Sequence, residues 1–238
     1  MNKESAQLYF LHIPKTSGLS LTAEIERIYS EEIVDGRDLL PVNKEPANPY
    51  TPLIIKKVIC GHYALNLFDS IKFDYVFSII REPVSRLISL YSYHHRFSPM
   101  NLSNKELFME FVFGTHPKID ASEFAGFDGQ PNSQSSYLST KVYLDECGLK
   151  RLPESPSIKK VFESIDNNNI DVFTLDNRDN LIEKLSVMFG STMTNRHSNV
   201  SPRVGFELSK SEISEILKLN SIDHELYETV RERELCSK

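Results

Sequence analysis

Residues 8–21 read LYFLHIPKTSGLSL, and this stretch decides the fold. Its first residues form an apolar run, which is typical of a strand buried inside a sheet. Pro14 ends the run, and the apolar spacing that follows predicts a helix over residues 19–30. A strand that passes through a short loop into a helix is the unit from which parallel α/β sheets are built.

The loop between this strand and helix has the composition of an anion site. Backbone N–H groups of residues 16–20 would face one point at the helix N-terminus, where the helix dipole favours negative charge. Lys15 adds a positive charge, and three hydroxyl groups follow it, from Thr16, Ser17 and Ser20. The loop departs from the GxxxxGK[ST] pattern of nucleotide triphosphatases, since its one glycine, Gly18, follows the lysine. An anion site and a plain N-capped turn with a solvated lysine both stay open on spacing alone.

The rest of the chain alternates strands with helices. Strands are expected at residues 7–13, 54–60, 74–80 and 170–175. Helices are expected at residues 19–30, from Pro83 onward, and at 105–113, 158–165, 179–189, 209–219 and 221–234. This alternation predicts an α/β three-layer sandwich of the P-loop-like type, with a mostly parallel central sheet flanked by helices. We expect a single domain over residues 1–238, with loops at 41–52 and 114–132.

The composition is that of a soluble globular protein, with 40% apolar and 25% charged residues. The net charge of −6 excludes a global basic field, so we expect no nucleic-acid partner. No stretch approaches the roughly 18 apolar residues of a membrane span. The three cysteines are widely spaced, which indicates neither a disulfide framework nor a zinc site and fits a cytoplasmic protein.

A second cation follows a second buried strand, in residues 79–91, IIREPVSRLISLY. Arg81 stands at the strand end, and Pro83 then suits the first position of a helix. On that helix Ser89 lies two turns in, so Arg81 and Ser89 can converge on one phosphate. The alternative is that Arg81 pairs with Glu82 and that the Ser89 hydroxyl bonds back to its own helix.

A histidine follows a third strand, in residues 60–63, CGHY. His62 would lie at the same sheet edge as Lys15 and Arg81, and histidine is well suited to remove a proton from an alcohol near neutral pH. The alternative is a structural histidine. A cationic rim at His94, His95 and Arg96, facing an acceptor, is likewise open against a favourable charge cluster at a helix end.

Taken together, HIPKTSGLS (12–20), CGHY (60–63) and IIREPVSRLISLY (79–91) resemble the signature of sulfotransferases that use 3′-phosphoadenosine 5′-phosphosulfate (PAPS). The closest resemblance is to the carbohydrate group that includes heparan and dermatan sulfate 2-O-sulfotransferases and their bacterial relatives. PNSQSSYLS (131–139) also resembles a segment of that family. Two positions depart from its pattern: Leu19 replaces a frequent threonine, and Cys60 replaces the first histidine of a His-Gly-His triplet.

The resemblance implies a role for each matching residue. The 5′-phosphosulfate would be bound by Lys15, Thr16, Ser17, Gly18, Leu19 and Ser20. The 3′-phosphate would be bound by Arg81 and Ser89, and a loop carrying Arg196 and Ser198 would close over the adenosine. His62 would act as base, and Lys15 would stabilise the leaving phosphate.

The implied enzyme is a cytoplasmic, bacterial O-sulfotransferase. It would move a sulfuryl group from PAPS to a hydroxyl of a saccharide or small metabolite and release 3′,5′-ADP. No metal is implied, because the chain has no HxxxH or carboxylate cluster at ligand spacing. A P-loop-like nucleotide kinase and a non-catalytic nucleotide-binding protein on the same fold remain the alternatives.

Overall fold

The computed structural model describes residues 8–29, 33–35, 58–62, 73–114, 129–139, 142–145, 148–151, 156–194 and 202–236. Its central sheet has five parallel strands in the order β2-β3-β1-β4-β7. Their bounds are Leu8–Leu11 (β1), Ile33–Asp35 (β2), Val58–Gly61 (β3), Tyr75–Ile80 (β4) and Ile170–Thr174 (β7). The expected α/β class with a parallel central sheet is confirmed, and each of the four expected strands overlaps an observed one.

The helices of the described residues include a match for each of the seven expected ranges. They are α1 (Gly18–Tyr29), α2 (Pro83–His94), α3 (Pro99–Leu102), α4 (Lys105–Val112), α5 (Ser133–Leu138), α6 (Ile158–Asn167), α7 (Arg178–Phe189), α8 (Lys210–Leu219) and α9 (Ser221–Cys236). The sequence did not predict α3, α5, β2 or the antiparallel hairpin of β5 (Val142–Asp145) and β6 (Gly148–Arg151). These elements are too short to show a period. The loop expected at 41–52 lies outside the described residues, as does 115–128 of the second loop.

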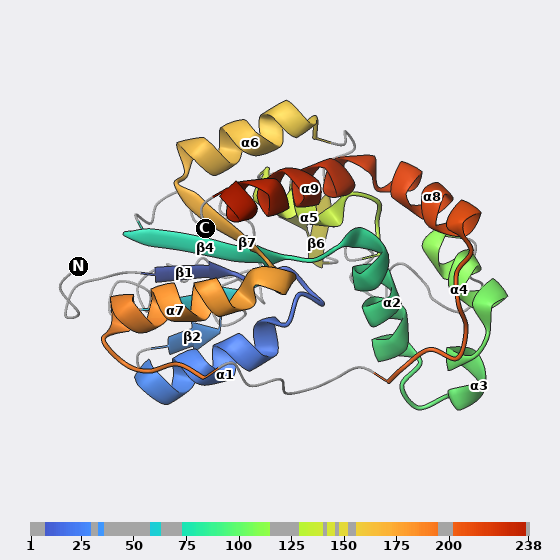
Figure 1. Cartoon of the computed structure of the whole chain (residues 1–238), viewed down its shortest axis with the longest axis horizontal. Coiled ribbons are helices and arrows are strands. Elements are labelled where there is room, and N and C mark those ends of the chain that lie inside the picture. The colour runs from blue at the N-terminus through green and yellow to red at the C-terminus, as the bar shows by residue number, and fades with distance from the viewer. Residues whose placement is uncertain are drawn as a thin grey trace.

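Both faces of the sheet are covered by helices, which gives three layers (Figure 1). Alternate residues of β1 point to opposite faces. Leu8 and Phe10 belong to a core cluster with residues of α1 and α7. Tyr9 and Leu11 belong to a second cluster with residues of α5, α6 and α9. A strand buried on both faces explains why residues 8–11 are apolar without alternation.

The order in which the chain adds strands to the sheet reverses at β1, in the centre of the sheet. From β1 the chain builds β2 and β3 on one side, and later β4 and β7 on the other. Leu11 at the end of β1 is in register with Gly61 of β3 and with Ser78 of β4. In open α/β sheets, ligands bind at such a switch point, outside the carboxyl ends of the strands. The loop after β1 occupies that point.

A third core cluster lies beyond this edge of the sheet, where α2 packs against α4 and α8 (Figure 1). Its centre is Tyr91, whose ring is 5.3 Å from that of Phe108 and whose hydroxyl donates to Asn101 O at 2.5 Å. The sheet edge is therefore bordered by a packed group of helices. Within the described residues, no helix has the length and apolar character needed to span a membrane.

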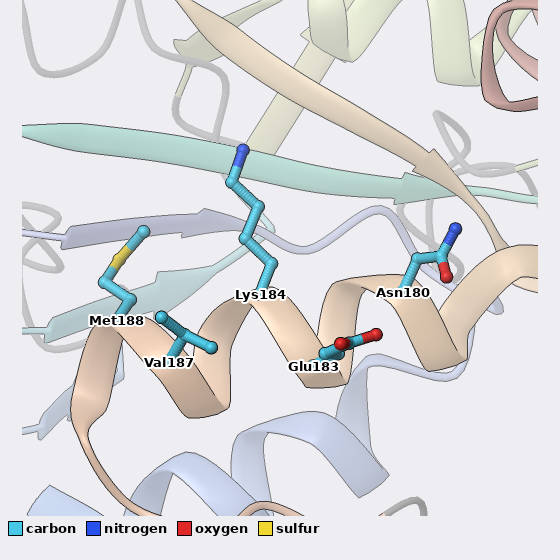
Figure 2. A pocket seen from close by; sticks show the side chains of 5 residues that line it. All are labelled: Asn180, Glu183, Lys184, Val187 and Met188. Atoms are coloured by element: carbon cyan, nitrogen blue, oxygen red, sulfur yellow. The ribbon is translucent and has the colours of Figure 1, made fainter. Parts of the chain in front are cut away.

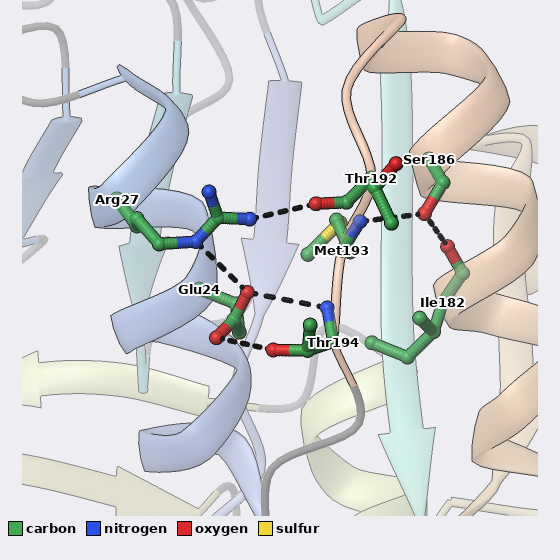
Figure 3. Close-up of polar contacts among 7 residues, drawn as sticks. All are labelled: Glu24, Arg27, Ile182, Ser186, Thr192, Met193 and Thr194. Carbon is green, nitrogen blue, oxygen red and sulfur yellow. Dashed lines mark hydrogen bonds and ion pairs between the residues drawn. The ribbon is translucent and has the colours of Figure 1, made fainter.

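Side chains of α1 hold the segment that leaves α7 (Figure 3). Glu24 is buried, and its carboxylate accepts hydrogen bonds from Thr194 Oγ1 at 2.8 Å, Thr194 N at 3.3 Å and Arg27 Nε at 3.2 Å. Arg27 Nη2 also donates to Thr192 O at 2.7 Å. The contacts fix the chain directly before residues 195–201, which lie outside the described residues.

We expect Glu24→Gln to lower the free energy of unfolding at neutral pH by about 1–3 kcal/mol, because an amide cannot accept all three hydrogen bonds. Burial by itself raises the pKa of Glu24, but hydrogen bonds from Thr194 and Arg27 hold it below its ordinary 4.5. A carboxyl with a lowered folded-state pKa stabilises the fold above its unfolded pKa and loses this effect as the pH falls through the folded value. The difference between variant and wild type should therefore shrink in acid.

Urea denaturation near pH 7 and near pH 3 measures this difference. Glu26→Gln is the matched control, because Glu26 is exposed on the same helix. An equal loss for Glu24→Gln at both pH values would contradict the assigned role of the carboxylate.

Candidate functional site

The loop after β1 has an unusual backbone. Lys15 and Ser17 have φ of 70° and 72°, in the left-handed region, while Thr16 between them does not. A non-glycine residue in this region costs on the order of 1–3 kcal/mol and persists only where its surroundings hold it. Alternating signs of φ turn successive N–H groups toward one concavity, which is an anion-binding arrangement.

Three arginines from different elements contact this loop. Arg86 of α2 donates from Nε to Pro14 O at 3.1 Å, and Arg81 donates from Nη1 to Lys15 O at 3.4 Å. Arg178, at the start of α7, is 2% exposed and donates from Nη1 to Ser17 Oγ at 3.4 Å. Two carbonyls and one hydroxyl of the loop thus accept hydrogen bonds from guanidinium groups, and these bonds hold its strained conformation.

The hydroxyl groups of the loop are not equivalent. Thr16 is fully buried, and its Oγ1 donates to Ile13 O at 2.7 Å, so the hydroxyl proton is used within the loop. What Thr16 offers a ligand is its backbone N–H. Ser20 is buried in the first turn of α1, whereas the side chain of Leu19 is 58% exposed.

Gly18 opens α1 with the imidazole of His12 lying directly against it. A Cβ placed at Gly18 would be 1.9 Å from Cδ2 and Nε2 of His12, so no side chain fits there. Burial, followed by the charges of His62 and Lys15, lowers the pKa of His12 well below its ordinary 6.5. His12 is therefore a neutral, packed ring at neutral pH.

His62 follows β3 and is held by the backbone of His12. Its Nδ1 lies 2.6 Å from His12 O, and the two rings are 4.2 Å apart between centroids. Because a carbonyl oxygen only accepts, Nδ1 carries the hydrogen, and in the neutral ring Nε2 has the free electron pair. The structure thus places His62 beside the loop in the tautomer that a base acting through Nε2 requires.

Arg81 follows β4, and a side chain distant in sequence fixes its backbone. Gln134 of α5 accepts from Arg81 N at 2.9 Å and donates to Arg81 O at 2.9 Å. Asp223 of α9 in turn accepts from Gln134 N at 3.1 Å and Ser135 N at 2.7 Å. The segment 131–139 therefore fixes the backbone of Arg81 through Gln134.

Glu82 is not the partner of the Arg81 side chain. It caps α2, accepting from Val84 N at 2.9 Å and Ser85 N at 2.7 Å. Burial lowers the pKa of Arg81, and the charges of Glu82 and Asp176 oppose this effect. Ser89 is buried on α2, while Arg196 and Ser198 lie outside the described residues.

The Lys15 side chain lies among positive charges. Burial, then Arg81, Arg96 and Arg86, lower its pKa to about 8. Its Nζ is 4.3 Å from the centroid of the Tyr93 ring, and none of the ion pairs between described residues involves it. Such an excess of positive charge at a strained loop is what an anion site requires.

Of the three residues considered for a cationic rim, one is exposed. Burial lowers the pKa of His94 to about 4, helped by His95, Lys15 and Arg96, so His94 is neutral at pH 7. The ring of His95 packs at 4.5 Å on that of Tyr91, and its Nδ1 lies 3.0 Å from Asn101 Nδ2. Arg96 alone is exposed.

A hollow of about 510 Å³ lies elsewhere, beside α7, and Lys184 and Met188 extend from the helix toward the strands there (Figure 2). Its lining residues are Asn180, Glu183, Lys184, Val187 and Met188, and Lys184 is paired with Asp171. None of the sequence-predicted site residues lines it. The described residues hold no group of three His, Cys, Asp or Glu side chains placed to bind a metal ion.

Sequence reasoning found Lys15, His62 and Arg81, which the structure brings to one edge of the sheet. It did not assign roles to Arg86, Arg178, Gln134 or Tyr93. Arg86 could have been noticed from the helix after Arg81, since it lies on the first turns of α2. Tyr93 lies on the same helix, two turns after Arg86, but no pattern marks it as a neighbour of Lys15. Gln134 and Arg178 come from positions far along the chain, where no local pattern marks them.

The sequence matches no family model and no curated protein. Among solved structures, the fold is similar to mouse sulfotransferase SULT7A1 complexed with PAP, with 14% identity, a TM-score of 0.42, and coverage of 92% of this chain and 66% of that one. It is also similar to a sulfotransferase from Alicyclobacillus acidocaldarius, with 12% identity, a TM-score of 0.47, and coverage of 92% of both chains. At these identities the likeness concerns the fold.

Proposed function

We propose that this protein is a sulfotransferase that moves a sulfuryl group from PAPS to a hydroxyl of an acceptor. The observation that carries the proposal is the concentration of Lys15, Arg81, Arg86 and Arg178 around a strained loop at the switch point of a parallel sheet. The motifs at 12–20, 60–63 and 79–91 select PAPS among the anions that such a site could hold.

The donor substrate would be bound at both phosphate ends. Lys15 and the N–H groups of the loop, with Ser17 and Ser20, suit the 5′-phosphosulfate. Arg81 and Ser89 suit the 3′-phosphate, since a guanidinium binds phosphate oxygens bidentately. Arg196 and Ser198 remain our proposal for the adenosine.

The reaction needs no covalent intermediate. His62 Nε2 removes the proton of the acceptor hydroxyl as its oxygen attacks sulfur, and the bond between sulfur and the phosphate oxygen breaks. Lys15 stabilises the negative charge that develops on this leaving oxygen. The products are the sulfate ester and 3′,5′-ADP, with the proton on His62. Positioning and electrostatics supply the catalysis, as in phosphoryl transfer.

For the acceptor we propose a saccharide or a small-molecule alcohol. The resemblance to carbohydrate sulfotransferases supports the first, although Cys60 departs from the pattern of glycan 2-O-sulfotransferases. Beside Lys15, the exposed side chains of Tyr93 and Arg96 border the site, and the exposed ring of Phe97 lies against Arg96. A turnover assay with PAPS and a panel of sugars, phenols and aliphatic alcohols distinguishes these classes.

We expect Arg81→Ala to weaken 3′,5′-ADP binding by about 10- to 100-fold, the usual loss when a hydrogen-bonded charge is removed. Binding of 5′-AMP, which lacks the 3′-phosphate, should weaken less, because it is affected only through the lost hydrogen bond from Arg81 to Lys15 O. The backbone at position 81 is held by Gln134, so this substitution removes only the side chain. Isothermal titration calorimetry measures both ligands.

Arg231→Ala is the matched control, because Arg231 is an exposed arginine of α9 paired with Glu228. ATP with Mg²⁺ is the competing ligand. Tighter binding of ATP than of 3′,5′-ADP would overturn the proposal in favour of a nucleotide kinase. Tight 3′,5′-ADP binding without turnover of PAPS on any acceptor would favour a non-catalytic nucleotide-binding protein.

A further inference from the structure

Lys15 extends from the loop after β1 to the last turn of α2. Its Nζ lies over the ring of Tyr93, 4.3 Å from the centroid. The guanidinium carbon of Arg96 is also 4.3 Å from this centroid, and Arg96 Nη1 donates to Tyr93 O at 2.7 Å. Tyr93 is 43% exposed, so its ring is a surface at the border of the site and not part of the core.

The groups that face Lys15 are cations or neutral imidazoles. Arg86 belongs to α2, Arg81 precedes it and Arg96 follows it, and all three repel the ammonium group. The charge of Lys15 also lowers the pKa of His12, which follows β1, and of His94, the last residue of α2. No described carboxylate pairs with Lys15 to balance this repulsion. The face of Tyr93 is therefore the attractive contact of the ammonium group.

At this position an aromatic face can attract the ammonium group without neutralising its charge, which a carboxylate cannot do. Its quadrupole attracts a cation, by an amount that grows as the pair is removed from water, yet it brings no net charge. A carboxylate would hold the ammonium group more strongly but would cancel the charge that an incoming anion needs. Tyr93 favours the protonated lysine and leaves its full charge available.

We propose that Tyr93 is the positioning residue of Lys15, holding the ammonium group protonated at the border of the anion site through the face of its ring. The role of Lys15 in binding and catalysis rests on the proposed function. The contact between Lys15 and Tyr93 does not, because it exists in the ligand-free protein. Burial and three arginines hold the pKa of Lys15 near 8. Removal of the Tyr93 ring should then lower the pKa of Lys15 toward 7.

The test measures the pKa of Lys15 in the ligand-free protein by NMR of ¹³C-lysine-labelled protein, with Lys15→Arg identifying the resonance. From the usual strength of cation–π contacts, we expect Tyr93→Leu to lower the pKa of Lys15 by about 0.5–1.5 units. Tyr93→Phe keeps the ring face and should stay close to the wild type. Arg96→Ala is the opposite control: it removes a repelling charge and should raise the pKa.

Incorporation of pentafluorophenylalanine at position 93 keeps the ring in place and reverses its quadrupole, so it separates electrostatics from shape. We expect a decrease at least as large as that of Tyr93→Leu, together with an acid shift of the alkaline limb of the kcat/KM profile, which reports the pKa of the free enzyme. An unchanged pKa in the fluorinated protein would overturn the role of Tyr93, whatever the protein binds. A shifted pKa in a protein that binds no 3′,5′-ADP would support the role of Tyr93 and refute the sulfotransferase proposal.

Discussion

Replacing His62 with alanine is expected to lower kcat for sulfuryl transfer by about 10²–10⁴-fold, the usual loss when a general base is removed. The Nδ1 of His62 is engaged by His12 O at 2.6 Å, which leaves Nε2 to accept the proton. The loop that would bind the donor does not depend on this ring. Affinity for 3′,5′-ADP should therefore stay within about threefold, as measured by calorimetry beside steady-state assays.

His62→Asn distinguishes a base from a structural histidine. The asparagine amide can still donate to His12 O, but it has no basic nitrogen to receive a proton. If His62 acts as base, the asparagine variant should be as slow as the alanine variant. Substantial turnover in His62→Asn would show that another group removes the proton.

Replacing Gly18 with alanine is expected to destabilise the fold by about 1–3 kcal/mol, the usual cost of overpacking a core. The new Cβ would lie 1.9 Å from the ring of His12, so either the ring or the start of α1 must move. Both movements disturb the site, because His12 O accepts the hydrogen bond of His62 and the first turn of α1 supplies part of the N–H groups that face the ligand. We expect 3′,5′-ADP binding to be lost at the concentrations used for the wild type.

A double-mutant cycle with His12 tests whether the clash causes this loss of stability. Gly18 is the first residue of α1, where the helix-interior preference for alanine is not at work, so without the clash the substitution would be close to neutral. In the background of His12→Ala the obstacle is gone, and adding Gly18→Ala should then cost little. Urea denaturation of the four proteins gives the coupling energy of the pair. Additive effects would contradict the contact.

Much of the fold could be predicted from the sequence because the central strands are buried on both faces. The apolar runs that include residues 8–11 and 75–80 are unmistakable, and the helices that cover them carry regular apolar stripes. Strand ends in a parallel sheet share one edge, so Lys15, His62 and Arg81 could be placed together without coordinates. The short α5, made mostly of polar residues that are nonetheless buried, gave no such signal.

What the sequence could not show is how these residues are held. Thr16 was expected to offer its hydroxyl to the ligand, but the group has a partner within its own loop, Ile13 O. His94 and His95 were considered for a cationic rim, and both are enclosed by aromatic neighbours. Arg178 reaches Ser17 across 161 positions of sequence. Such contacts arise from tertiary packing, which leaves no periodic trace.

The support of Arg81 has a consequence for how the protein is made. Arg81 is held by Gln134, and the N-terminus of α5 is held by Asp223 of α9. During translation, the loop around Lys15 leaves the ribosome early and the residues around Asp223 leave it late. The loop around Lys15 and the strand end at Arg81 are therefore both synthesised well before α9, which supports the backbone at Arg81 through Gln134. In a growing chain, the backbone at Arg81 is held in this way only after α9 has emerged from the exit tunnel and docked.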